Sequence, residues 1–321
     1  MNPDALHEMS VDSNGNRNRP VLAFSCDNGF AFPMLAAACS ALRSTTEQVE
    51  IVVLDAGMTA ETLDKVKRIL SVSANLRIVS MDAAATNILS KFNMRRHQSV
   101  ATYARLLMPS LVRDLKQCLY VDCDVLFTDD CSQLWKQGIE AIRATPAAAI
   151  QDYGYARQAN APGLQRTLET GEADATATYF NAGVLMMDLD AWREQELGER
   201  ILKRATEEPG GFENVDQDAI NLTLGRRIAP LDSRWNVQLD AVWSRPSIQS
   251  ERAAAVSDPG LLHFTGPRKP WHAGRPRKER LRWMKAALVS PATSVLTARE
   301  KAVWLRRYAA GWPRVLRGRS R

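Results

Sequence analysis

The sequence lacks any run close to the roughly 18 uninterrupted apolar residues that a membrane-spanning helix requires, which excludes an integral membrane protein. Residues 1–19 are polar and contain no apolar core, so they fail as a signal peptide and predict a disordered leader. The five cysteines form an odd set with no C-x-x-C pair, which argues against a disulfide framework and a four-thiolate zinc site. We therefore expect a reducing compartment, the cytoplasm.

Charge of both signs is present, but it is unevenly distributed. Residues 268–321 hold 16 Lys and Arg against two Glu, a balance of +14. Residues 1–267 carry 26 basic and 34 acidic side chains, a balance of −8. With 45% apolar residues among 321, the chain can bury a full core. The distribution predicts a globular domain over 20–272 and a basic extension over 273–321.

The basic extension carries a regular aromatic pattern. Trp304, Tyr308 and Trp312 recur at the spacing of one helical face, with arginines interleaved at positions 306, 307 and 314. Such a helix favours an anionic membrane surface, so we predict peripheral attachment to the inner face of the cytoplasmic membrane, with no nucleic acid partner expected. The alternative is that the aromatic face packs on the chain's own domain. Pro313 is expected to break this helix near its end.

Short apolar runs alternate with helical patterns along the rest of the chain. This order is typical of βαβ units and predicts an α/β fold with a mostly parallel sheet. Asp190 is expected to cap a helix that begins at Ala191. The expected strands are 21–26, 51–54, 76–79, 119–127, 147–150, 180–187 and 261–264, with further helices at 31–43 and 215–224. Ligands of such sheets bind beyond the carboxyl ends of the strands, so the functional residues are sought there.

Two carboxylates interrupt the otherwise apolar strand predicted over 119–127. Asp122 and Asp124 share one face of that strand, with Cα atoms about 6.6 Å apart, so both can reach one cation. Chance alone gives about one Asp-x-Asp pair among 20 Asp, and the chain has three, so the motif itself is weak. Its apolar context favours a metal site over capping or surface carboxylates. Cys123 points to the opposite face and is interpreted as a packing residue.

A second polar turn follows the last predicted strand. His263 follows an apolar pair, a position in which a histidine is more often a core residue than a ligand. Gly266 allows close approach of the backbone to a ligand, and Lys269 supplies a compact cation for a phosphate. An imidazole beside two carboxylates suits manganese or magnesium better than structural zinc.

Six ordered stretches together resemble one known family. The stretches are Thr102 to Leu106 (TYARL), Leu119 to Leu126 (LYVDCDVL), Tyr179 to Leu185 (YFNAGVL), Asp216 to Asn221 (DQDAIN), Arg234 to Asn236 (RWN) and His263 to His272 (HFTGPRKPWH). The chain resembles the retaining, metal-dependent glycosyltransferases of family eight, which include bacterial lipooligosaccharide galactosyltransferases, lipopolysaccharide core glucosyltransferases and, more distantly, glycogenin. The resemblance implies a GT-A fold that binds a nucleotide-sugar.

The resemblance also implies roles for individual residues. Asp122, Asp124 and His263 are expected to hold Mn²⁺, with Mg²⁺ as the alternative, and through it a UDP-hexose. Gln217, Asp216 and Asp152 are the expected catalytic residues. The expected donor-binding residues are Asp27, Asn28, Phe30, Thr102, Arg105, Asp122, Cys123, Asp124, Asn181, Asp216, Gln217, Gly266 and Lys269.

The predicted base pocket departs from the family pattern. Related enzymes often read Asp-Asp-Asn-Tyr where this chain has Cys26-Asp27-Asn28-Gly29-Phe30, so Cys26 replaces an acidic contact to uracil. A stacking ring would have to come from Phe30, which could equally be the first core residue of the following helix.

The predicted reaction leaves several alternatives open. Front-face attack by the acceptor is favoured over double displacement because the Gln217 amide is a poor nucleophile. The segment from Tyr153 to Thr178 is either an acceptor loop or a plain surface insertion. The basic extension favours a glycolipid acceptor, a lipooligosaccharide or lipopolysaccharide core. Galactose and glucose donors are not distinguished. The rival functions are a glycoside hydrolase, a metal-dependent nucleotidyltransferase and a non-catalytic protein that binds sugar nucleotides or glycans.

Overall fold

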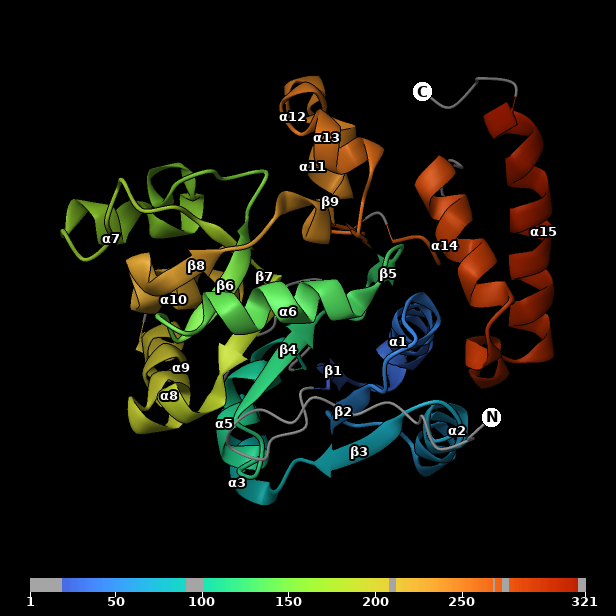
Figure 1. Ribbon diagram of the computed structural model, residues 1–321, viewed down its shortest axis with the longest axis horizontal. Helices are drawn as coiled ribbons and strands as arrows, with labels where there is room; N and C mark the ends of the chain where they lie inside the picture. Colours follow the sequence, from blue (N-terminus) through green and yellow to red (C-terminus); the bar gives the residue numbers. More distant parts are fainter. Residues whose placement is uncertain (1–18, 91–100, 208–211, 268, 273–276, 317–321) are drawn as a thin grey trace, which may run out of the picture.

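The computed structural model describes residues 19–90, 101–207, 212–267, 269–272 and 277–316, and its centre is a seven-stranded sheet (Figure 1). The strand order is β3-β2-β1-β4-β7-β6-β8. β7 runs antiparallel to its neighbours β4 and β6, whereas the other adjacent pairs are parallel. The strands are β1 (Val21–Cys26), β2 (Glu50–Asp55), β3 (Asn75–Ser80), β4 (Gln117–Val121), β6 (Ala147–Gln151), β7 (Phe180–Asp188) and β8 (Ile228–Pro230). The predicted α/β fold with a mostly parallel sheet is confirmed.

Helices cover both faces of the sheet, as the alternation of apolar patterns predicts. α1 (Ala31–Ser44) follows β1 directly and is almost wholly buried, whereas α2 (Ala60–Leu70) buries only Val66 and Leu70. α6 lies across the sheet in the view of Figure 1, and α8, α9 and α10 gather beside β7. The further helices of the central part are α3 (Ala83–Ser90), α4 (Ala101–Ala104), α5 (Met108–Leu111), α6 (Cys131–Ala141), α7 (Gln165–Glu169), α8 (Leu189–Glu194), α9 (Leu197–Glu207) and α10 (Val215–Leu224).

The prediction of a single strand over 119–127 is wrong. The structure has two strands there, interrupted at the two aspartates. Asp122, Cys123 and Asp124 form a turn between β4 and β5 (Val125–Phe127). β5 leaves the large sheet and joins a second one of order β5-β10-β9, with β10 at Leu261–His263 and β9 at Val237–Gln238. The turn is held on both sides, since Asp122 N donates to Gly183 O at 2.8 Å and Phe264 N donates to Asp124 O at 2.9 Å. The carboxylates therefore lie where the two sheets meet.

The expected helix after β7 begins earlier than predicted. α8 starts at Leu189, and its N-cap is Asp188, whose carboxylate accepts a hydrogen bond from Ala191 N at 3.0 Å. Asp190 lies in the first turn and pairs with Arg193 instead. The shift arises because β7 continues to Asp188, so the helix begins at the next residue.

The basic extension packs against the domain in its described part. Between β9 and β10 lie α11 (Leu239–Ser244), α12 (Pro246–Glu251) and α13 (Ala253–Ser257). The basic extension itself contains α14 (Lys278–Leu288) and α15 (Ala298–Leu316). α14 and α15 lie side by side next to α1 (Figure 1). Arg43 of α1 donates to the carbonyl oxygen of Ala286 at 3.1 Å. None of the helices in the described ranges is long and apolar enough to cross a membrane.

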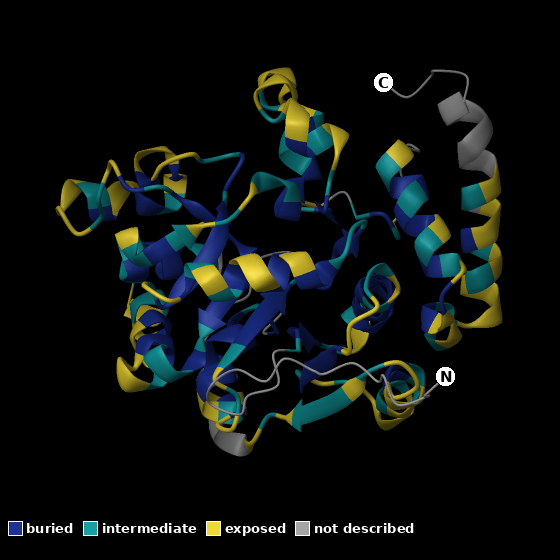
Figure 2. Cartoon of the chain, viewed as in Figure 1, coloured by how far each residue is buried: buried dark blue, intermediate teal, exposed yellow. Residues whose placement is uncertain are grey.

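Trp304 and Tyr308, from the aromatic face of α15, pack against the core. The rest of the described part of this helix is mostly exposed or intermediate (Figure 2). The Trp304 ring is buried against Phe32 and Trp283, with centroids 4.9 and 5.4 Å away. Tyr308 is half-buried against the same core. The alternative interpretation, that this face packs on its own domain, is therefore the one observed for both rings. α15 also continues past Pro313 to Leu316, so the predicted break is wrong. The side chains of Arg307, Trp312 and Arg314, like the leader up to residue 18, lie outside the described residues.

Candidate active site

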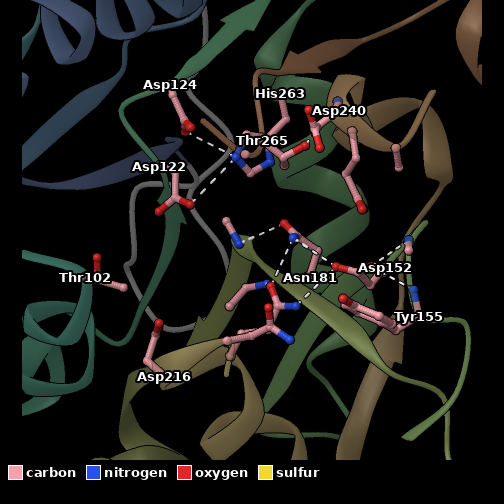
Figure 3. A pocket seen from close by; sticks show the side chains of 18 of the residues that line it. Thr102, Asp122, Asp124, Asp152, Tyr155, Asn181, Asp216, Asp240, His263 and Thr265 are labelled. Carbon is pink, nitrogen blue, oxygen red and sulfur yellow. Dashed lines mark hydrogen bonds and ion pairs between the residues drawn. The ribbon is translucent and has the colours of Figure 1, made fainter. Parts of the chain in front are cut away.

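A polar cavity of about 450 Å³ opens where the two sheets meet (Figure 3). β7, the β4–β5 turn, α10 and the turn after β10 all contribute to its wall. Most residues selected from the sequence line it. These are Thr102, Arg105, Asp122, Asp124, Asp152, Asn181, Asp216, Gln217, His263, Gly266 and Lys269. Residues up to 167 positions apart thus converge on one cavity, as the motifs predict.

Asp122, Asp124 and His263 form a compact group of three potential metal ligands. One ligand atom from each lies within 4.8 Å of the other two. His263 Nε2 is 3.2 Å from Asp124 Oδ1 and 3.7 Å from Asp122 Oδ2 (Figure 3). Asp124 and His263 are buried, and Asp122 is partly exposed toward the cavity. Two carboxylates and one imidazole suit Mn²⁺ or Mg²⁺, so the residues present fit the expected metal.

Two cations neutralise the carboxylates of this group. Lys269 Nζ contacts Asp124 Oδ2 and donates to the carbonyl oxygen of Phe264 at 2.8 Å. Burial opposes ionisation of Asp124, but the charge of Lys269 outweighs it, with a smaller contribution from the adjacent His263 ring, and holds the pKa of the carboxyl below the usual range. On the other side, Arg105 Nη2 donates to Asp122 Oδ1 at 2.9 Å. The Asp124 carboxyl is therefore ionised and can accept a cation.

Arg105 is a buried cation shared by two acidic side chains. Its Nε lies 3.0 Å from Asp216 Oδ2, although this ion pair lacks the geometry of a hydrogen bond. Burial alone would lower the pKa of Arg105, but Asp122 and Asp216 raise it above its ordinary value. The guanidinium also lies over the Tyr120 ring at 4.2 Å. Arg105 also donates to the carbonyl oxygens of Thr102 and Ala182, so it ties the Asp122–Asp124 turn to β7 and α10. Its predicted contact with the donor sugar stays a prediction.

Burial dominates the chemistry of Asp216 itself. Burial raises the pKa of its carboxyl to about 6, despite the opposing charge of Arg105. Asp216 lies in the first turn of α10, beside Gln217. This carboxyl therefore gains its charge as the pH rises through about 6.

Asp152, Asn181 and Gln217 form a second polar group across the cavity from the aspartate turn. Asp152 Oδ2 accepts from Gln217 Nε2 at 3.1 Å and from Asn181 Nδ2 at 3.3 Å. Its Oδ1 accepts from the backbone N–H groups of Gly154 and Tyr155. Burial raises the pKa of the Asp152 carboxyl, although these hydrogen bonds oppose the shift. Carboxylate and amide groups in a cavity are suited to orienting sugar hydroxyls.

The remaining predicted donor-binding residues lie outside the lining of this cavity, around the carboxyl end of β1. Asp27 accepts from Phe30 N at 3.0 Å, and Asn28 Oδ1 accepts from Thr59 N at 3.2 Å. The half-buried Phe30 ring meets the edge of Trp271, 5.9 Å between centroids. Cys123 is buried and donates to the carbonyl oxygen of Ser25, which agrees with a packing residue. Because β1 pairs with β4, this group adjoins the aspartate turn.

Several residues of the site were missed as functional positions, among them the lining residues Asn214, Gln238, Asp240 and Thr265. Gly183 and Asn236 were missed as well, although each lies in a motif used for the resemblance. A Cβ added to Gly183 would lie 2.3 Å from His263 Cε1 and 2.6 Å from Asp122 Oδ2, so only glycine fits behind the ligands. Asn236 is fully buried and hydrogen-bonds His263 Nδ1 at 2.8 Å. The sequence signals that could have found them were the glycine inside the strand predicted over 180–187 and the asparagine that follows Trp235.

The segment from Tyr153 to Thr178 is more than a plain surface insertion. Gly154 and Tyr155, at its start, line the cavity. Farther along, the segment contains α7 and returns to itself through a bridge between Arg157 and Thr178. Its first residues are therefore placed to contact whatever enters the cavity.

Comparisons with known proteins agree with this architecture. A solved structure of the galactosyltransferase LgtC with donor and acceptor sugar analogs aligns at a TM-score of 0.70 and 24% identity, covering 84% of this chain and 96% of that one. General stress protein A of Bacillus subtilis (strain 168) is 28% identical over 236 residues, 70% of this chain and 77% of the relative. Lipopolysaccharide 1,2-glucosyltransferase of Escherichia coli (strain K12) is 27% identical over 177 residues, 54% of this chain and 50% of the relative.

The expected GT-A fold is confirmed by the likeness to the LgtC structures. The model for glycosyl transferase family 8 matches residues 21–274, a range that contains every residue of the cavity. The same range excludes α14 and α15. The chain is a member of glycosyl transferase family 8.

Proposed function

We propose that the protein is a metal-dependent, retaining hexosyltransferase that moves galactose or glucose from a UDP-sugar to a saccharide acceptor. The observation that carries this proposal is the convergence of Asp122, Asp124 and His263 at the wall of a polar cavity. Lys269 lies beside them and can pair with a phosphate. A cation site, a phosphate-binding lysine and a group of sugar-orienting side chains are what transfer from a nucleotide-sugar requires.

The charge that develops on the departing diphosphate has to be stabilised. A divalent cation held by Asp122, Asp124 and His263 supplies a Lewis acid for the diphosphate oxygens. Lys269 adds a second positive charge on the same side of the cavity. Gly266 has a φ of +71°, and a Cβ there would lie 2.8 Å from Asp240, so glycine keeps this turn open to the ligand.

The sugar is oriented from the opposite wall. Asp152 and Asn181 are positioned by their mutual hydrogen bond and can accept and donate to sugar hydroxyls. The Gln217 carbonyl oxygen already accepts from Asn181 Nδ2 and Ala182 N, both at 3.0 Å, which further reduces its weak nucleophilicity. We therefore favour front-face attack, with the leaving phosphate oxygen assisting deprotonation of the acceptor hydroxyl. The anionic carboxylates of Asp152 and Asp216 offset the positive charge that develops on the sugar.

The proposed acceptor is a glycolipid, specifically a lipooligosaccharide or lipopolysaccharide core. One comparison supports this class, since one relative is named a lipopolysaccharide 1,2-glucosyltransferase. Lys278, Lys285, Arg299 and Arg306 are exposed on α14 and α15. We propose that these cations, rather than Trp304, contact an anionic membrane surface from the cytoplasmic side.

A UDP-release assay with core oligosaccharide as acceptor tests the proposal. Wild-type protein should release UDP from UDP-galactose or UDP-glucose in the presence of Mn²⁺. This release of UDP should stop when EDTA is added. Asp124→Asn should lower the rate by at least about 100-fold because it weakens the metal site. The matched control Asp114→Asn alters a carboxylate that pairs with Arg77 far from the cavity, and it should leave the rate unchanged. Binding of the UDP-sugars without any release of UDP would instead identify a non-catalytic binding protein.

A further inference from the structure

A chain of directional hydrogen bonds runs from a backbone amide to the imidazole of His263. Gly183 N donates to Asn181 Oδ1 at 3.1 Å, and Asn236 Nδ2 donates to the same oxygen at 2.9 Å. Asn236 Oδ1 then lies 2.8 Å from His263 Nδ1. The side chains of Asn181, Asn236 and His263 are all buried. Water is therefore a poor substitute for any member of this chain.

The direction of the chain is fixed at its first member. A backbone N–H can only donate, so Gly183 requires the oxygen of the Asn181 amide to face it. The other end of that amide is fixed as well, because Gln217 Oε1 accepts from Ala182 N and must receive a hydrogen from Asn181 Nδ2. Two backbone donors thus determine the orientation of Asn181. Its oxygen in turn requires the Asn236 side chain to present its amide nitrogen.

The orientation of Asn236 determines the tautomer of His263. With its nitrogen committed to Asn181, Asn236 offers its oxygen to the imidazole, so Nδ1 has to carry the hydrogen. Nε2 is the ring nitrogen that faces Asp124 and Asp122, at 3.2 and 3.7 Å. In the neutral ring, the lone pair of Nε2 is then directed between the Asp122 and Asp124 carboxylates. That is the form of histidine that ligates a metal.

We propose that Asn236 is the positioning residue of the metal centre, which selects the metal-binding tautomer of His263 and links it to the sugar-orienting amides. This inference rests on the proposed function, because it presumes that a cation binds Asp122, Asp124 and His263. Asn236 touches neither the cation nor the sugar. It acts through the imidazole on one side and through Asn181 on the other.

The two hydrogen bonds of Asn236 can be separated by substitution. Asn236→Asp keeps an oxygen for His263 Nδ1 but removes the donor to Asn181 Oδ1. Asn181 would then lose a partner and face a second oxygen, so the sugar side is disturbed while the metal ligand stays oriented. Asn236→Ala removes both hydrogen bonds and frees the imidazole to adopt the other tautomer.

Mn²⁺ titration of the full chain, followed by the electron paramagnetic resonance of free Mn²⁺, separates these effects without any turnover. Asn236→Ala should weaken Mn²⁺ binding 10- to 100-fold, the range typical for loss of an outer-shell partner. Asn236→Asp should bind Mn²⁺ within about threefold of wild type but lose at least about tenfold in kcat for UDP release. Gln158→Ala is the matched control, because it removes another fully buried amide whose Nε2 donates to Asn221 O. It should lower the melting temperature without changing Mn²⁺ affinity.

The outcomes distinguish the inference from the function on which it rests. If wild-type protein binds no Mn²⁺, the proposed metal-dependent function fails. If wild type binds Mn²⁺ and Asn236→Ala binds it equally well, the positioning role of Asn236 is overturned. Loss of Mn²⁺ affinity in Asn236→Asp as large as in Asn236→Ala would also overturn it, because the oxygen acceptor alone would then not orient His263.

Discussion

At the scale of single residues, the site depends on more groups than Asp122, Asp124 and His263. Gly183 leaves room for the ligands that its neighbours on β4 and β10 present. Arg105 and Lys269 neutralise the paired carboxylates from opposite sides. Asn236 orients the imidazole from behind. The ligand set of Asp122, Asp124 and His263 is therefore only the part of the metal centre that faces the cavity.

Gly183→Ala should disrupt the metal centre directly. The added Cβ would overlap the His263 ring and the Asp122 carboxylate, at 2.3 and 2.6 Å, and neither group can move without leaving the ion's position. We expect Mn²⁺ affinity to fall at least about tenfold in a binding titration. Gly138→Ala is the control, since its Cβ would press only on the flexible Met186 side chain. Unchanged Mn²⁺ affinity in Gly183→Ala would contradict the packing account.

The pH dependence of stability should report Asp216. Its carboxyl binds a proton more tightly in the folded chain, where its pKa is about 6, than in the unfolded chain, where it is 3.8. Its stabilising contribution is therefore complete below pH 3.8 and is lost as the pH rises through about 6. The variant Asp216→Asn has no titrating carboxyl at this position, so its stability does not fall over this pH range for this reason. Relative to wild type, its free energy of unfolding should rise by about 1 kcal/mol from pH 5 to pH 7.5, measured by urea denaturation. A difference that stays constant with pH would contradict the shift.

At the scale of elements, apolar runs predicted the order of strands but not their partners. Periodicity identified β1, β2, β3, β6, β7 and β10, because each is an apolar run between clear turns. All of them except β3, which is half-buried at the edge of the sheet, are buried. It missed the break at Asp122–Asp124, because the apolar residues before and after the aspartates are buried in different sheets. Sequence spacing carries no information on which sheet a strand joins. The convergence of the β4–β5 turn, β10 and α10 on one cavity was therefore predicted from the motifs. The hydrogen bonds of Asn236 are known only from the structure.

Whether the aromatic face of α15 serves the core or a membrane can be tested on two adjacent residues. Trp304→Ala removes a buried ring between Phe32 and Trp283 and should lower the free energy of unfolding by about 3 kcal/mol. Leu305→Ala, whose side chain is 55% exposed, should change it by less than about 0.5 kcal/mol. Thermal or urea denaturation of both variants provides the measurement. If Trp304→Ala were as stable as Leu305→Ala, the Trp304 ring would not stabilise the core, and contact of this ring with a membrane would be favoured instead.

At the scale of the whole molecule, the basic helices and the cavity are physically connected. Arg280 of α14 donates to the carbonyl oxygens of Lys269 and His272, so the helix holds the turn that carries Lys269, the lysine that we propose binds the donor phosphate. The same region of the chain offers exposed cations on α14 and α15. One segment can therefore serve both the donor site and attachment to a charged surface.

Attachment through exposed cations should depend on salt and on the charge of the lipid. Arg299→Glu with Arg306→Glu should reduce cosedimentation with anionic phosphatidylglycerol vesicles at least about fivefold, since each cation near the surface contributes about 1 kcal/mol. Both side chains are exposed and distant in sequence from the cavity residues, so Mn²⁺ affinity should stay the same. Binding of wild type that is equal on neutral and anionic vesicles would contradict an electrostatic attachment.

The most direct test is whether UDP binding requires the divalent cation and its three ligands. Isothermal titration with UDP should give a clear binding signal for the wild type in Mn²⁺ and none in EDTA. Asp122→Asn, Asp124→Asn and His263→Ala should each abolish most of the Mn²⁺-dependent signal while the protein stays folded. UDP that binds equally well in EDTA, or to all three variants, would contradict the central claim that these side chains hold the ion on which the nucleotide is bound.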